Sequence, residues 1–366
     1  MISLASIITY TKADLLAQQG DTLLPRQLQS LADLEHCRSA VSKHLQAACS
    51  ACDTQVLIPH SCGNRLCPTC QSHESQRWIE RQRQLQVKAS YFMVTFTLPA
   101  ELRRLAFAHQ RVVYQALMQT SWETVRTFSL NDKKLQGTPG AVAVLHTHTR
   151  RLDYHPHVHL VMPAGAIDLK HRQWRQKQGK APYLFSHKAM AKVFRAKLLD
   201  ALATAGLPLP ERIPRRWVVH CKPVGSGAKA IVYLGRYLYR GVIREKDILA
   251  FDNGEVTFQY RDGKSRQLKR RTLPAVAFLR LILSHVLPKG FRRARNFGYL
   301  HPNSKRLLQL LQLLQKVIVS SSPPSPRPAL RCPCCQAPMT FVRTQIPASR
   351  ASSPPRSTSA QGVHAM

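Results

Sequence analysis

The sequence predicts an α+β protein in which helices pack on a central sheet and a small zinc-binding domain precedes that sheet. Between residues 91 and 242, strand-length segments rich in aromatic and β-branched residues alternate with longer segments of helical length. This alternation favours helices packed on a sheet. Upstream of it, Cys-x-x-Cys pairs indicate a module that a metal ion stabilises.

The expected elements follow in chain order. Apolar residues at helical spacing predict helix over residues 1–36, a cysteine-rich segment occupies 37–73, and a polar helix is expected over 76–88. In the sheet region we expect strands over 91–98, 141–147, 155–162 and 216–221, and helices over 102–130, 186–204 and 227–242. Further along, a strand over 255–260, a turn over 261–264 and a helix over 274–287 are expected.

Composition divides the chain into four expected parts. Residues 1–88 form the helical and zinc-binding domain, residues 89–245 hold the sheet and a tyrosine-bearing helix, and residues 246–320 form a basic extension. Residues 321–366 are expected to be a mostly disordered Ser/Pro-rich tail that contains one more Cys-x-x-Cys pair.

The charge of the chain points to a polyanionic partner. Lys and Arg number 54 against 19 Asp and Glu, which gives a formal net charge of +35. Such an excess predicts nucleic-acid binding. The most apolar run, residues 273–287, is too short to span a bilayer, and no secretory signal is evident, so we expect a cytoplasmic protein associated with the nucleoid. Its ten cysteines should then be reduced, and clustered ones should bind metal.

Two Cys-x-x-Cys pairs, Cys49 with Cys52 and Cys67 with Cys70, are the main candidates for a structural zinc site. Two such pairs complete a tetrahedral set of thiolates and leave no position for substrate. Other cysteines and histidines nearby could replace a ligand or belong to a second site: Cys37, His44, His60, Cys62 and His73. Near the C-terminus, Cys332 and Cys335 form either half of a zinc knuckle completed elsewhere or a reactive loop.

The segment His157-Val158-His159 is the candidate for a second kind of metal site. Side chains alternate between the two faces of a strand, so both imidazoles point the same way while Val158 points the opposite way. Such a pair can hold a divalent ion, for which we expect Mg²⁺ or Mn²⁺. Two histidines leave the ion short of protein ligands, and the sequence does not choose among the candidates for a third, namely His146, Asp153, His155 and His220.

The expected helix over 227–242 supplies a candidate nucleophile. Tyr233 and Tyr237 lie four residues apart and therefore share a helical face, whereas Tyr239 points elsewhere. A tyrosine hydroxyl that attacks a phosphodiester bond preserves the bond energy for rejoining, and the chain has no GxxxxGK[ST] phosphate loop. The basic residues expected to contact DNA are Lys222, Arg236, Arg240, Lys269, Arg270 and Arg271.

Over roughly residues 35–300, the chain resembles the IS91-type transposases of the HUH endonuclease superfamily. The resemblance rests on residues 61–70, on Val94-Thr95-Phe96-Thr97-Leu98-Pro99 and on Tyr154-His155-Pro156-His157-Val158-His159. It continues in Lys222-Pro223, in Tyr233-Leu234-Gly235-Arg236-Tyr237 and in residues 285–291.

The resemblance implies a ferredoxin-like antiparallel sheet with helices on one face, within a catalytic domain over residues 89–245, and an N-terminal zinc-binding domain. It also implies a bacterial insertion element or plasmid as host, and rolling-circle-like transposition of single-stranded DNA through covalent 5′-phosphotyrosine intermediates. His157 and His159 match the family's metal-binding motif, and Tyr233 and Tyr237 match its two nucleophiles. Single-stranded DNA at element ends and target site would be the partner, with host replication proteins as further candidates.

Other functions stay open from the sequence. A plasmid replication initiator or relaxase of the same class would use the same site, and a non-catalytic zinc-dependent DNA-binding protein would need neither tyrosine. A transposase that relies on three spaced acids is disfavoured, because the 19 acids show no convincing set.

Overall fold

The computed structural model describes residues 2–39, 41–70, 72–177, 184–239, 241–263, 265–317 and 329–345. The chain forms two compact units: Met1–Cys37 with Cys62–Arg327, and Arg38–Ser61 with Pro328–Met366. Each unit therefore combines segments that are distant in sequence. The four consecutive parts expected from composition do not follow this division, because composition does not reveal which distant segments pair.

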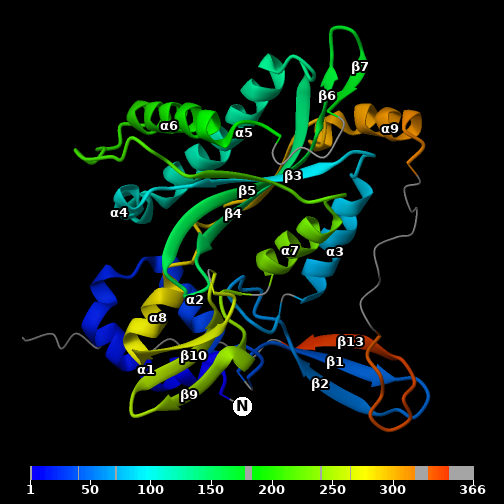
Figure 1. The fold of residues 1–366 in the computed structure, drawn as a ribbon. Helices are drawn as coiled ribbons and strands as arrows, with labels where there is room; N and C mark the ends of the chain where they lie inside the picture. The colour runs from blue at the N-terminus through cyan, green and yellow to red at the C-terminus, as the bar shows by residue number, and fades with distance from the viewer. Residues whose placement is uncertain are drawn as a thin grey trace, which may run out of the picture. The chain divides into compact units, whose positions relative to one another are not determined.

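The larger unit is built on one antiparallel sheet (Figure 1). Its strand order is β7-β6-β4-β5-β3-β8, and β12 pairs with β4 off this path. The strands are β3 Tyr91–Thr97, β4 Thr138–His148, β5 Tyr154–Pro163, β6 Gly165–Asp168, β7 Gln173–Gln176, β8 Val219–Pro223 and β12 Ala294–Gly298. An α+β fold with an antiparallel central sheet is thus confirmed.

Helices cover both faces of this sheet. On one face, α4 Arg103–Ala108, α5 Gln110–Asn131 and α6 His187–Thr204 pack against side chains such as Val94, Leu145 and Val158. On the other face, α3 Ser72–Gln84, α7 Ala228–Tyr239 and α9 Lys305–Leu314 pack against Val144 and Val161 (Figure 1). The implied placement of helices on one face only is therefore wrong for this chain, since apolar residues line both faces of the central strands and both need cover.

A second core in the same unit joins the N-terminal helices to later elements. Helices α1 Leu4–Gln19 and α2 Pro25–Glu35 pack with α8 Ala275–Leu283 and with a three-stranded sheet of order β11-β10-β9. These strands are β9 Ile248–Asp252, β10 Glu255–Arg261 and β11 Leu268–Pro274. The described part of this unit also contains four short 3₁₀ helices: Gly20–Thr22, Ala100–Leu102, Glu245–Asp247 and Pro302–Ser304. The helix expected over residues 1–36 is thus two helices, and the strand expected over 255–260 is the centre of a small sheet.

The smaller unit is a three-stranded antiparallel sheet of order β13-β1-β2. Its strands are β1 His44–Cys49, β2 Gln55–Pro59 and β13 Met339–Gln345. The expectation of a mostly disordered tail is wrong for residues 329–345, because β13 pairs with β1 along its length. The rest of that tail, residues 321–328 and the residues after 345, lies outside the described residues. Among the described helices, none has both the length and the apolar composition needed to cross a membrane.

A glycine sets how closely helices α3 and α7 approach one another. A Cβ atom at Gly235 of α7 would lie 2.4 Å from Cγ1 of Ile79 and 3.0 Å from the indole of Trp78, both on α3. The carbonyl of Gly235 also accepts a hydrogen bond from the Ser75 hydroxyl at 3.0 Å. Only glycine therefore allows α3 and α7 to pack this closely.

We expect Gly235→Ala to destabilise the protein by about 1–3 kcal/mol, because overpacking outweighs the helix propensity that alanine adds. The measurement is denaturant unfolding followed by fluorescence. Gly20→Ala is the matched control, since Gly20 has helical backbone angles and nothing within 4 Å of its Cβ position. Equal stabilities for the two variants would contradict the close contact.

His285, which follows α8, is buried as a neutral imidazole. Its Nε2–H donates to the carbonyl of Leu152 at 2.9 Å, and its Nδ1 is buried without a hydrogen-bond partner in the described structure. Burial lowers the pKa of His285 from 6.5 to about 4. Between these two pH values the His285 imidazole is therefore neutral in the folded protein and protonated in the unfolded chain.

Stability should fall as the pH is lowered from about 6.5 towards about 4, because the unfolded chain binds a proton at His285 over this window and the folded chain does not. His285→Gln, whose amide can still donate to Leu152, should remove about 2–3 kcal/mol of this acid-dependent loss. Urea titrations over this pH range measure it. His109→Gln, a change at an exposed histidine, is the control, and its free energy of unfolding should depend on pH as that of the parent does. The same pH dependence in His285→Gln as in the parent would refute the assignment to His285.

Candidate functional site

Three histidines meet on the face of the central sheet that α7 covers. In the antiparallel pairing of β4 with β5, His146 lies opposite His157, and His159 follows two residues later on the same side. A ring nitrogen from each of the three falls within 4.8 Å of the others. The expected pair thus becomes a convergent set of three imidazoles.

Hydrogen bonds orient these imidazoles. Nδ1 of His157 donates to the carbonyl of His155 at 2.7 Å, and Nδ1 of His159 lies 2.8 Å from the hydroxyl of Thr95. Both rings therefore keep Nε2 available, the arrangement found when histidine binds a metal. Nε2 of His146 is buried and has no hydrogen-bond partner in the described structure, as expected of a ligand atom.

Burial also sets the protonation state of these rings. It lowers the pKa of His157 to about 4 and that of His159 to about 3, and it lowers the pKa of the fully buried His146 well below 6.5. All three imidazoles are therefore neutral near pH 7, which is the form that coordinates a metal. The residues present fit a divalent ion in both geometry and charge state.

The other candidates for a third ligand are engaged elsewhere. His155 accepts a hydrogen bond from the guanidinium of Arg103 at 2.7 Å. Asp153 pairs with Arg271 at 2.8 Å. His220 is exposed on β8, opposite Thr95 and one strand further from the cluster. Neither Thr95 nor the register that selects His146 could be recognised as functional from residue spacing alone.

The two tyrosines of α7 lie against the histidines in different ways. Tyr233 is 46% exposed, and the centre of its ring lies 6.0 Å from that of His146 and 6.1 Å from that of His159. Tyr237 instead stacks on His146, with ring centres 3.3 Å apart, and its hydroxyl accepts the backbone N–H of Thr147 at 3.2 Å. Burial raises the pKa of both phenols, so both are protonated near pH 7.

Arg293, just before β12, was not recognised from the sequence. Its guanidinium carbon lies 5.9 Å from the centre of the Tyr237 ring, and it donates to the Tyr237 carbonyl at 3.4 Å. Burial lowers the pKa of Arg293 to about 10, which still leaves it charged near pH 7. A fixed positive charge therefore lies beside the buried tyrosine.

A cavity of about 1060 Å³ opens over this cluster. His146, His157, Tyr233 and Tyr237 line it. Its described lining also holds seven basic side chains against a single acid, Asp247, which already pairs with Arg244. The basic residues are Arg83, Arg150, Lys229, Arg236, Arg244, Lys246 and Arg261. The cavity therefore attracts a polyanion to the tyrosines.

The expected DNA contacts occupy varied positions. Arg236 lines the cavity, Lys222 is exposed on β8, and Lys269 and Arg270 are exposed on β11. Arg271 differs, because its guanidinium pairs with Asp153 and so braces the loop before β5. Arg240 lies outside the described residues.

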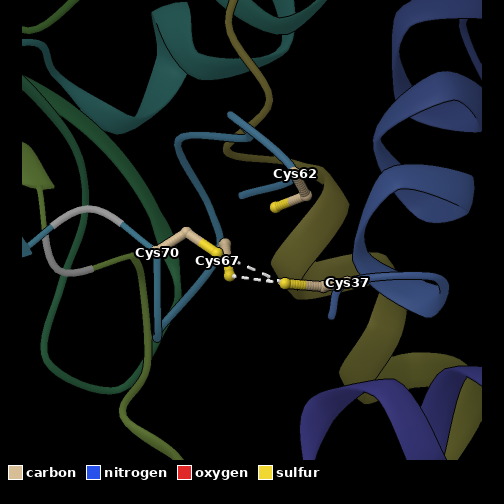
Figure 2. Close-up of side chains that lie close together, drawn as sticks. All are labelled: Cys37, Cys62, Cys67 and Cys70. Carbon is tan, nitrogen blue, oxygen red and sulfur yellow. Dashed lines mark hydrogen bonds between the residues drawn. The ribbon is translucent and has the colours of Figure 1, made fainter. Parts of the chain in front are cut away.

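The cysteines form two groups of four, and neither is the expected one. Cys37 after α2 meets Cys62, Cys67 and Cys70 from the loop before α3 (Figure 2). In this group the Cys37 sulfur lies 3.5 Å from that of Cys67 and 3.4 Å from that of Cys70.

Cys49 and Cys52 belong to the other group, with Cys332 and Cys335 in the smaller unit. The expected set of Cys49, Cys52, Cys67 and Cys70 is therefore corrected. Each Cys-x-x-Cys pair finds partners in its own unit, and sequence distance does not reveal which. The histidines considered alongside them, His44, His60 and His73, belong to neither group.

Two family models match parts of the chain. The family model described as "Putative transposase" matches residues 140–307, which include all three histidines and both tyrosines. The model described as "Transposase zinc-binding domain" matches residues 7–98, which include Cys37, Cys49, Cys52, Cys62, Cys67 and Cys70.

Two curated relatives match most of the chain. Putative transposase y4qJ of Sinorhizobium fredii (strain NBRC 101917 / NGR234) is 32% identical over 306 residues, covering 77% of this chain and 76% of that protein. The transposase for insertion sequence element IS801 of Pseudomonas savastanoi pv. phaseolicola is 28% identical over 281 residues, covering 70% of this chain and 66% of that protein.

A solved structure of TrwC complexed with a 27-mer DNA, comprising a recognition hairpin and cleavage site, is a more distant match. It is 14% identical, with a TM-score of 0.27, and the match covers 62% of this chain and 75% of that one. At this level the two proteins need share no function. The two family models and the close relative nevertheless agree, and this chain belongs to the IS91 family of insertion-sequence transposases, with an N-terminal zinc-binding domain.

Proposed function

We propose that this transposase cuts and rejoins single-stranded DNA at the ends of its element through covalent 5′-phosphotyrosine intermediates. The observation that carries the proposal is the convergence of three neutral imidazoles beside Tyr233 within a basic cavity. His146, His157 and His159 would hold Mg²⁺ or Mn²⁺, which would polarise the scissile phosphate and neutralise its charge.

Tyr233 is the first nucleophile in this proposal, because this residue is about half exposed in the cavity and its ring lies next to those of His146 and His159. Its phenolic oxygen attacks phosphorus, and the bond from phosphorus to the 3′-oxygen breaks. The phenol proton is lost, and the 3′-oxygen leaves as a hydroxyl after taking up a proton. The product holds the 5′-phosphate on tyrosine, and attack by a 3′-hydroxyl reverses the step without an energy source.

Tyr237 is the second nucleophile. Its hydroxyl is bound by the Thr147 N–H and its ring lies against His146, so it reacts only after α7 shifts or the contact with Thr147 opens. Two tyrosines on one helix then allow one DNA end to stay attached while a second is cut. This sequence of events matches a rolling-circle-like pathway.

Single-stranded DNA fits the lining of the cavity. Seven cations can follow the phosphates, and the aromatic faces of Tyr233 and Tyr260 at the same surface can stack on unpaired bases. Exposed Lys222, Lys269 and Arg270 can extend the contact. The group of Cys37, Cys62, Cys67 and Cys70 would hold a structural zinc ion, since four thiolates close its coordination sphere.

Removing the tyrosine hydroxyls tests the chemistry. We expect Tyr233→Phe to lower formation of the protein–DNA adduct by at least about 10³-fold, because the first nucleophile is lost while the ring still packs. Tyr237→Phe should retain the first adduct and lose transposition. Denaturing gels with labelled single-stranded element ends, and mass spectrometry of the attached peptide, measure this.

Tyr239→Phe is the matched control, since Tyr239 does not line the cavity, and it should behave as the parent. An adduct that maps to Tyr239, or that persists when both Tyr233 and Tyr237 are replaced, would show that the nucleophiles are misassigned.

Replacing the histidines tests the metal. His157→Ala with His159→Ala, and His146→Ala alone, should abolish Mg²⁺- or Mn²⁺-dependent cleavage. DNA affinity should change little, because Lys and Arg contacts to phosphate supply most of it. His220→Ala, at an exposed histidine of β8, should cleave as the parent does. Cleavage and binding are compared on the same oligonucleotide, and full cleavage by the double variant would remove the cluster from the mechanism.

A further inference from the structure

The four cysteines of the smaller unit form a compact set of sulfur atoms. The sulfur of Cys49 lies 3.5 Å from that of Cys335, and the sulfur of Cys52 lies 3.5 Å from that of Cys332. All four sulfurs fall within 4.8 Å of one another. A zinc ion bound to four thiolates at about 2.3 Å requires sulfurs about 3.8 Å apart, so the spacing suits a tetrahedral site.

The two Cys-x-x-Cys turns have the same backbone geometry. In the first, the N–H of Asp53 donates to the Cys49 carbonyl at 3.1 Å, and the Cys49 N–H donates to the Thr54 carbonyl at 3.0 Å. Asp53, the residue after the second cysteine, has a φ of 53°.

The second turn repeats each of these features. The N–H of Gln336 donates to the Cys332 carbonyl at 3.0 Å, the Cys332 N–H donates to the Ala337 carbonyl at 2.9 Å, and Gln336 has a φ of 60°. In both turns a non-glycine residue has backbone angles in the left-handed region, which is unfavourable without a compensating interaction. The repetition shows two equivalent knuckles that present their sulfurs to one centre.

The described residues of this unit form only a small apolar core. Its buried hydrophobic cluster is Ala47, Cys49, Cys332 and Met339, with Val56, Ile58 and Leu330 partly buried against it, so half of the buried cluster is cysteine. Units below about 70 residues rarely gain enough stability from a hydrophobic core alone, and natural ones add disulfides or a metal. We therefore infer that Cys49 and Cys332 stabilise this unit, in place of the larger apolar side chains that usually form a core.

We propose that Cys49, Cys52, Cys332 and Cys335 bind a second structural zinc ion, independent of the group around Cys67. Neither matched family range contains Cys332 or Cys335, so this site depends on a part of the chain that the family models do not include. The chain then binds two zinc ions, and the second ion ties β1 and β2 to β13 across 280 residues of sequence between Cys52 and Cys332.

Metal analysis of the purified full-length protein, prepared without added metal, tests the stoichiometry. We expect about two zinc ions per chain, falling to about one in Cys332→Ser/Cys335→Ser. Cys67→Ser should lose the other ion. Cys334→Ser is the matched control, because Cys334 lies between the two ligands yet is not in the group, and it should keep both. One zinc ion in the parent, iron in place of zinc, or an unchanged count in the double variant would overturn the proposal.

Thiol alkylation with mass spectrometry tests the long-range partnership. Replacing Cys332 and Cys335 should expose Cys49 and Cys52 to the reagent while Cys37, Cys62, Cys67 and Cys70 stay protected. Detachment of β13 in the double variant would also expose these thiols, so the parent chain is labelled with and without a chelator as a second measurement, and the chelator should expose all four thiols of the smaller unit. Continued protection of Cys49 and Cys52 in the double variant would overturn the proposal. The proposal would also be overturned if, in the parent chain, a reductant exposed these thiols to the reagent and a chelator did not. Disulfides would then explain the protection.

Discussion

The site depends on the antiparallel register between β4 and β5. That register places His146 opposite His157 and sets His159 beside them, all on one face of the sheet. A slip of one residue would turn the histidines of one strand to the opposite face, into the core beneath α5 and α6. The apolar residues that alternate with the histidines oppose such a slip, because Leu145 and Val158 are fully buried in that core.

The position of α7 follows from the same constraint. Its apolar residues, among them Ile231 and Leu234, pack against α3 and the sheet, and this leaves Tyr233 and Tyr237 over the histidines. Gly235 lies between the two tyrosines in sequence, and its missing side chain allows α3 to pack closely against α7. The two tyrosines are thus positioned by packing, on a stretch of α7 that also brings Arg236 to the cavity.

Neutral and charged side chains have different roles around the histidine cluster. Burial keeps the three imidazoles neutral, so they can coordinate a cation although the cavity above them is lined by basic side chains. The cations of the cavity attract phosphate, and a metal ion would concentrate positive charge at a single phosphodiester. Arg293, beside Tyr237, places a further fixed charge next to the tyrosine that is less accessible.

The sequence by itself determined the local features of this protein. Strand alternation put His157 and His159 on one face, helical spacing put Tyr233 and Tyr237 on one face, and Cys-x-x-Cys spacing made the metal-binding turns. Charge and motifs predicted the DNA partner and the family. These features depend on residues within a few positions of one another, so the sequence suffices to recognise them.

Only the tertiary structure decided which distant groups meet. Strand pairing selected His146 over Asp153, His155 and His220, because those three are bound or displaced elsewhere. The division of the chain into two units separated the cysteines into two groups, and it gave Cys49 and Cys52 partners 280 or more residues away. Such choices depend on which strands pair and which faces are covered, and residues far apart in sequence carry no local signal of that pairing.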